Sequence, residues 1–176
     1  MINKIEQYKK VLYLLDKNNV EYIQYEHMPA LTYEDLLKVQ KETGFYGSET
    51  KSMALNIGSS QFIVCNTLQG KRLNINKIKE TINQSRKDLH LNEIKSIKLA
   101  TKEELEEHFG AEPGCMYPFG FSKNIDIFVD ETIFQTEWLL FSPVLPTRTI
   151  QAKAIDLKKV YDNIGNRVTY VNDFTL

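Results

Sequence analysis

The sequence of residues 1–176 predicts a single domain of the α+β class with a mixed β-sheet. Three observations lead to this class. The chain has the length of one domain. Hydrophobic residues make up 42% of it and charged residues 26%, the balance of a globular protein with a core. Helical and β-hairpin patterns are interleaved, without the strict strand–helix–strand alternation of a parallel sheet.

Apolar periodicity predicts the elements of the first half of the chain. In chain order these are a helix over 5–15, a strand over 20–26, a helix that ends near 43, a β-hairpin with strands over 53–57 and 61–67, and a helix over 76–87. Thr32 with Asp35 predicts the N-cap of the second helix, and Gly44 predicts its end.

The second half is predicted in the same way. Its elements are a strand over 94–100, a helix over 101–110, a structured loop over 112–122, strands over 125–129, 138–141 and 147–152, a helix over 155–161 and a last strand over 167–171. Thr101 and Glu104 form the pattern of a capping box, and Gly110 ends the helix that this box opens.

The charge pattern limits the classes of partner. The net charge is -1, whereas a protein that holds a long stretch of nucleic acid is usually strongly basic. We therefore expect a small nucleic-acid footprint at most, and no DNA partner. The stretch 71–98 is nevertheless basic, with eight basic and three acidic residues. It is either a nucleic-acid contact or one of two solvated helix faces, the other being the acidic stretch 101–112.

Other partners and compartments are judged from composition. No apolar run approaches the ~20 residues that a membrane-spanning helix needs, so no membrane partner is expected. The segment 1–10 is too charged for a signal peptide, which favours a cytoplasmic protein. Cys65 and Cys115 form no CxxC pair, and the three histidines are scattered, so neither a metal site nor a cofactor is predicted.

Two features are candidates for chemistry. The loop 110–120 contains three glycines and two prolines, which together give a rigid backbone whose amides point in fixed directions. Such a loop can bind a small polar group or a developing oxyanion, or it can be a structural connection. Lys51 precedes an apolar run and is either a phosphate-binding charge or an ordinary surface lysine. A nucleophilic pair of Cys115 and His27 is a further alternative.

The order of these segments resembles the YbaK/ProX family, the aminoacyl-tRNA deacylase domain that also occurs inserted in bacterial prolyl-tRNA synthetases. The resemblance extends from about His27 to Tyr161. The similar segments are His27-x-x-Ala30-x-Thr32, Lys51-Ser52-Met53-Ala54-Leu55, Phe62-Ile63-Val64, Gly70-Lys71-Arg72-Leu73-Asn74, the run from Leu99 to Leu105, Gly110-Ala111-Glu112-Pro113-Gly114, Pro118-Phe119-Gly120 and Ile127-Phe128-Val129-Asp130-Glu131.

The resemblance implies a curved, mixed sheet flanked by helices. It also implies a trans-editing hydrolase that acts on the acceptor end of tRNA and cleaves the ester of a small noncognate amino acid. An aminoacyl-tRNA synthetase is a possible further partner, and no cofactor is implied. A non-catalytic module of the same fold, which senses an amino acid, a nucleotide or a tRNA end, is the alternative.

The resemblance also implies roles for particular residues. Lys51 and Gly114 take the catalytic positions, Lys51 through the phosphate of the terminal nucleotide. The proposed substrate-binding residues are His27, Ala30, Thr32, Cys115, Met116, Tyr117 and Pro118. Asp130 matches an acidic position that we expect to be structural. Ser142 and Pro146 depart from the pattern of a subgroup that resembles alanyl-tRNA(Pro) editors, so the amino acid is left open among alanine, serine and cysteine.

Overall fold

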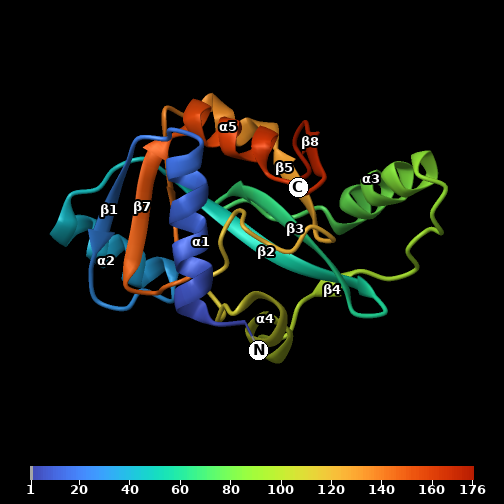
Figure 1. The fold of residues 1–176 in the computed structure, drawn as a ribbon, viewed down its shortest axis with the longest axis horizontal. Coiled ribbons are helices and arrows are strands. Elements are labelled where there is room, and N and C mark those ends of the chain that lie inside the picture. Colours follow the sequence, from blue (N-terminus) through green and yellow to red (C-terminus); the bar gives the residue numbers. More distant parts are fainter. Residues whose placement is uncertain (1) are drawn as a thin grey trace.

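The computed structural model describes residues 2–176 (Figure 1). Its helices are α1 (Lys4–Lys17), α2 (Tyr33–Thr43), α3 (Ile75–Asp88), α4 (Lys102–Phe109), the 3-10 helix η1 (Glu131–Gln135) and α5 (Ala154–Asn163). Its strands are β1 (Tyr22–Glu26), β2 (Ser48–Gly58), β3 (Gln61–Leu68), β4 (Lys98–Leu99), β5 (Asp126–Asp130), β6 (Trp138–Phe141), β7 (Arg148–Lys153) and β8 (Val168–Val171).

The strands form one mixed sheet in the order β1-β7-β6-β2-β3-β5-β8, and β4 pairs with β2 beside this path. The hairpin β2–β3 is antiparallel, as are the β1–β7 and β6–β7 pairs. The pairs β2–β6, β3–β5 and β5–β8 are parallel. This arrangement confirms the α+β class with a mixed sheet. Figure 1 shows α2, β1 and β7 at one end of the molecule and α3 at the other.

The two faces of the sheet bury different cores, because successive side chains of a strand point to opposite faces. Ala54 of β2 belongs to the larger core, together with residues of α1, α4 and α5. Leu55, the next residue, belongs to a second core that also contains Ile78 and Ile82 of α3. A third, smaller core joins Val39 of α2 to the sheet. Helices therefore cover both faces, and α2 and α3 lie over the same face.

The helix ends follow the sequence. Thr32 caps α2, its hydroxyl accepting from the Asp35 amide at 3.1 Å, and the Asp35 carboxylate accepts in return from the Thr32 amide. Gly44 ends that helix in the left-handed conformation. The same capping box and left-handed glycine enclose α4. None of the helices within residues 2–176 is long and apolar enough to cross a bilayer.

Three sequence expectations differ from the structure. The strand expected over 94–100 is reduced to β4, because Ile94 packs into the second core and bonds to Asn83 rather than to a strand. β2 begins at Ser48, five residues before the expected start at Met53. The first residues of β2 are polar, and they are in a strand because Ser48 and Glu49 pair with β6 and Thr50 pairs with β3. The 3-10 helix η1 was not expected; the Asp130 side chain caps it.

Candidate functional site

One edge of β2 is open in its middle. Along this edge, Ser48 and Glu49 pair with β6, while Leu55 and Asn56 pair with β4. Within residues 2–176, no strand covers the part of the edge between these two pairings. The Ala54 carbonyl accepts a hydrogen bond from the Ala100 amide on this side, at 3.0 Å. Backbone groups alternate in direction along a strand, so the N–H and C=O of Ser52, two residues earlier, also face the open edge.

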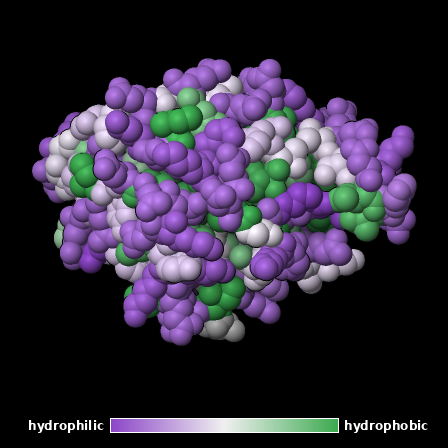
Figure 2. Space-filling view, turned by 45° about the horizontal axis from the view of Figure 1, so that its top comes forward, coloured by the Kyte–Doolittle hydropathy of each residue, from purple (hydrophilic) through white to green (hydrophobic). Residues whose placement is uncertain are grey.

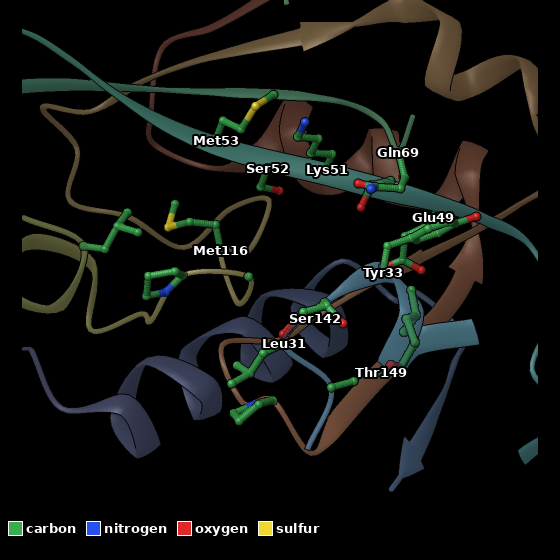
Figure 3. Close-up of a pocket in the computed structure, with 18 of the residues that line it drawn as sticks. Leu31, Tyr33, Glu49, Lys51, Ser52, Met53, Gln69, Met116, Ser142 and Thr149 are labelled. Carbon is green, nitrogen blue, oxygen red and sulfur yellow. The ribbon is translucent and has the colours of Figure 1, made fainter. Parts of the chain in front are cut away.

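A pocket of about 350 Å³ lies at this edge. β2 contributes one wall, from Glu49 to Ala54. The opposite side is formed by the segment between β1 and α2, by the Pro/Gly loop after α4 and by the turn between β6 and β7. Figure 3 shows Lys51, Ser52 and Met53 along β2 on one side, and Met116, Ser142 and Leu31 on the other. Segments far apart in the sequence therefore meet around one cavity.

Lys51 lies in the β2 wall of the pocket, opposite Thr67 of β3 in the strand register. Among residues 2–176, its ammonium group has no hydrogen-bond acceptor within 3.5 Å and no carboxylate within 4.0 Å. A lysine that is half-buried and unpaired beside a cavity is available to an anion that enters it.

Gly114 joins two walls of the pocket. The Cys115 amide donates to the Glu112 carbonyl at 2.9 Å, so residues 112–115 form a β-turn, and Gly114 has a φ of +88° in it. A Cβ atom on Gly114 would lie 2.2 Å from the Leu31 carbonyl oxygen. Only a glycine allows the loop to approach the β1–α2 segment this closely.

The β1–α2 segment is fixed by its own hydrogen bonds. The His27 Nδ1 lies 2.7 Å from the Met28 carbonyl oxygen, and Nε2 lies 2.9 Å from the Thr149 hydroxyl. A carbonyl can only accept, so Nδ1 donates to Met28, and Nε2 shares a hydrogen bond with the Thr149 hydroxyl. The Ala30 amide donates to the Pro146 carbonyl at 2.8 Å. His27, Ala30 and Thr32 all line the pocket.

The loop residues after Gly114 divide into two groups. Met116 lines the pocket, whereas Cys115, Tyr117 and Pro118 do not. Cys115 is fully buried, and the Tyr117 hydroxyl donates to the Phe109 carbonyl at 2.8 Å inside the core. The Pro118 carbonyl accepts from the Asn66 side chain at 3.0 Å. These three residues therefore hold the loop to the core, and of the loop residues 115–118 that the resemblance assigned to substrate binding, Met116 alone lines the cavity.

The structure does not form the cysteine–histidine pair that the sequence left open. Both ring nitrogens of His27 are within hydrogen-bond distance of other groups. Burial raises the pKa of the Cys115 thiol to about 11, and the Glu112 carboxylate acts in the same direction. A nucleophilic cysteine needs the opposite shift, because the thiolate is the reactive form. Among residues 2–176, no group of three or more His, Cys, Asp or Glu side chains could hold a metal ion.

Asp130 has the structural position that the sequence suggested. Its side chain is fully buried away from the pocket and accepts from the Thr67 hydroxyl at 2.8 Å and from the Thr132 amide at 3.0 Å. The Lys71 ammonium lies 3.5 Å away and donates to the Thr132 hydroxyl. Lys71 therefore compensates a buried charge.

Other cations of the basic stretch also make contacts within the fold. Lys77 donates to the Asp173 carbonyl, Lys79 to the Lys95 carbonyl, and Arg86 to the Asn92 carbonyl. These contacts leave fewer free cations than the net charge of the stretch suggests.

Glu49 is a pocket residue that sequence reasoning missed. It lines the cavity two residues before Lys51, and its Oε2 is shielded from solvent with no hydrogen-bond partner in the described chain. Burial raises the pKa of this carboxyl to about 8. Its position two residues before Lys51, on the same face of a strand, was the available signal. This signal was missed because the strand was expected to begin at Met53, after both Glu49 and Lys51.

Comparisons with known proteins agree with this fold and identify the family. Residues 27–160 match the family model described as an aminoacyl-tRNA editing domain, and the chain belongs to this family. A search of curated proteins gives no match. The family confirms the resemblance that the sequence motifs indicated.

Two solved structures share the fold. The hypothetical protein APE2540 has a TM-score of 0.72 and 18% identity, over 95% of this chain and 99% of its own. A protein described as a "putative trans-editing enzyme for prolyl tRNA synthetase" has a TM-score of 0.63 and 16% identity, over 95% of this chain and 97% of its own.

Proposed function

We propose that this protein is a trans-editing hydrolase that removes a small noncognate amino acid from tRNA. The observation that carries the proposal is the pocket at the open edge of β2, where Lys51 lies unpaired within the described chain and Gly114 forms the opposite wall. Membership of the aminoacyl-tRNA editing family supports the substrate class. The name of the similar structure supports action in trans.

The residues suggest how the reaction is assisted. Lys51 would pair with the phosphate of the terminal nucleotide and so position the ester. The Gly114 amide would donate to the oxyanion that develops when water attacks the ester carbonyl. The C–O bond then breaks, the ribose oxygen leaves as a hydroxyl after taking a proton, and the amino acid departs as a carboxylate. The ester is already activated, so positioning and oxyanion stabilisation account for the assistance that the protein gives.

The dimensions of the pocket favour a small amino acid. Its volume of about 350 Å³ is at the lower end of the range of roughly 300–1,000 Å³ for ligand sites. The terminal ribose would take part of that volume. Met116 and Leu31 lie on the wall opposite β2 and would limit the side chain that enters (Figure 3). We infer that selectivity depends on these two residues rather than on the buried Cys115 and Tyr117.

The test is a panel of mischarged tRNAs, beginning with tRNA(Pro) because of the similar structure. Lys51→Ala should lower kcat/KM by about 10- to 150-fold, the range for loss of a charge-assisted hydrogen bond. Lys9→Ala is the matched control, because Lys9 is exposed and outside the pocket. Near-normal turnover by Lys51→Ala would refute the role of Lys51. If no mischarged tRNA is hydrolysed above the buffer rate while one still binds, the protein is a binding module.

A further inference from the structure

The Glu49 carboxyl is an uncompensated buried group at the pocket. The residue as a whole is half-buried, and neither carboxyl oxygen accepts a hydrogen bond from residues 2–176. Oε2 is shielded from solvent, whereas Oε1 is not, so a donor that enters the pocket would meet the carboxyl at Oε1. A buried carboxylate without a partner is costly, because it has lost its hydration and gained nothing in exchange. Such a group in a ligand pocket is satisfied either by a proton or by a donor that the ligand brings.

The charged and titratable neighbours do not satisfy it. The other such residues that line the pocket are His27, Tyr33, Lys51 and Arg148. Arg148 pairs with Glu26 at 3.1 Å, and both nitrogens of His27 lie beside other groups. Lys51, on the same strand, lies more than 4.0 Å from the Glu49 carboxylate. This pocket-lining carboxyl therefore has no paired cation within the described chain.

We propose that Glu49 binds the α-ammonium group of the amino acid attached to the tRNA. This inference rests on the proposed function and deepens it, since it assigns the end of the substrate that Lys51 does not contact. Every aminoacyl ester carries an amino group next to its carbonyl, and the ammonium form supplies three donors and a positive charge. Glu49 and Lys51 are two residues apart on one strand face, a spacing of about 7 Å between Cα atoms. One would contact the amino end of the substrate and the other its phosphate.

This assignment explains two properties of Glu49. An ammonium group entering a pocket loses its hydration, and a carboxylate replaces the lost water. Burial raises the pKa of Glu49 to about 8, so the carboxyl is largely protonated at pH 7 and would give up its proton when the ammonium binds. The contact is common to all α-amino acids, so discrimination among side chains remains with Met116 and Leu31.

The first experiment compares substrates with and without the charge. A mischarged aminoacyl-tRNA and its N-acetyl derivative differ in the ammonium group, and both are esters. The wild-type protein should hydrolyse the free-amino substrate with a kcat/KM at least about tenfold higher. Glu49→Gln should remove this preference by slowing the free-amino substrate alone. Glu34→Gln, which changes an exposed glutamate outside the pocket, should keep the preference. A preference that survives in Glu49→Gln would overturn the assignment.

A second measurement needs neither turnover nor a variant. The wild-type protein is titrated with 3′-alanylamino-3′-deoxyadenosine, an amide analogue of the acceptor end, and with its N-acetyl form. The free-amino analogue should bind at least about tenfold more tightly. Equal affinities would overturn the role of Glu49 even if mischarged tRNA is hydrolysed. If the analogue preference is found but no mischarged tRNA is hydrolysed, the proposed hydrolysis fails and the amino-group contact stands.

Discussion

Gly114 and Gly70 have the same positive φ in different surroundings. Both have a φ of +88°, a region that residues with a Cβ rarely adopt. A Cβ on Gly70 would have no heavy atom within 4 Å, whereas one on Gly114 would lie 2.2 Å from the Leu31 carbonyl oxygen. The two glycines therefore separate the cost of the conformation from the cost of the contact.

Gly114→Ala should accordingly destabilise the protein more than Gly70→Ala. We expect about 1–2 kcal/mol for the conformation alone at Gly70. At Gly114 we expect a further ~1–3 kcal/mol, because the loop must move away from Leu31. Denaturant unfolding measures both values. Equal losses would show that the close approach to Leu31 does not constrain the loop. Turnover of mischarged tRNA should fall with Gly114→Ala and stay normal with Gly70→Ala.

Glu49 should make stability depend on pH. Its pKa is raised from 4.5 to about 8 in the folded protein, so between these values the folded state holds a proton that the unfolded state has lost. Stability contributed by this group is therefore full below pH 4.5 and falls as pH rises towards 8, by up to about 1.4 kcal/mol per pH unit.

The check is a set of urea unfolding curves between pH 5 and 9. Glu49→Gln should weaken this decline, because glutamine keeps the shape of the side chain but does not ionise. Glu34→Gln, with its exposed carboxyl, should follow the wild-type curve. A decline of the same slope in Glu49→Gln would assign it to another group.

At the scale of elements, α2 and α4 begin with the same capping box. Thr32 and Asp35 form the one, and Thr101 and Glu104 form the other. Thr32 also lines the pocket, and Thr101 does not. Thr32 therefore has two roles: its side chain stabilises the first turn of α2, and it forms part of the pocket wall.

Alanine substitutions should separate these consequences. Thr32→Ala and Thr101→Ala should each cost about 1 kcal/mol, since each removes an N-cap side chain. The kcat/KM for mischarged tRNA should fall only for Thr32→Ala, because the segment from His27 to Thr32 loses a fixed end beside the cavity. Thermal unfolding and turnover are measured on the same samples. A comparable loss of turnover in Thr101→Ala would mean that activity follows stability alone.

At the scale of the whole molecule, charge is distributed in a way that limits the tRNA contact. The net charge is -1, and several cations of the basic stretch bond within the fold, Lys71 to a buried cluster around Asp130. The face seen in Figure 2 is mostly hydrophilic, with hydrophobic residues in separate small patches. A molecule of this kind fits a partner that it touches over a small area, such as an acceptor end.

Because the contact with tRNA is small, we expect kcat/KM for mischarged tRNA to depend only weakly on salt concentration. A plot of log kcat/KM against log salt concentration should have a slope of magnitude no greater than about 3, since each neutralised phosphate of a single strand contributes about 0.7. Lys51→Ala should reduce the slope by about 1. Lys9→Ala should leave it unchanged. A slope of the wild-type protein near 6 or more would indicate an extended tRNA surface and contradict the small footprint.

The basic stretch illustrates what charge counting misses. Charge reversal at Lys71 is a poor probe of tRNA binding, because it would leave Asp130 buried without its cation. Arg72→Glu is the better probe, since Arg72 makes no ion pair within residues 2–176. An unchanged tRNA affinity in Arg72→Glu would remove this residue from the contact.

The sequence by itself determined the local features of this protein. Helix caps, the hairpin and the Pro/Gly loop follow from short-range chemistry, and all of them are observed. The ordered motifs also identified the family, which the matched family model confirms. These features depend on neighbours in the chain, so a pattern of residues is enough to predict them.

Only the tertiary structure decided which residues meet at the pocket. The buried positions of Cys115 and Tyr117 depend on how the loop packs on the core, and the environment of Glu49 depends on β6, which pairs with β2 at this residue. The open edge of β2 exists because β6 and β4 pair with its two ends and leave its middle uncovered. Burial and pairing between segments distant in sequence set these features, and such contacts leave no periodic trace along the chain.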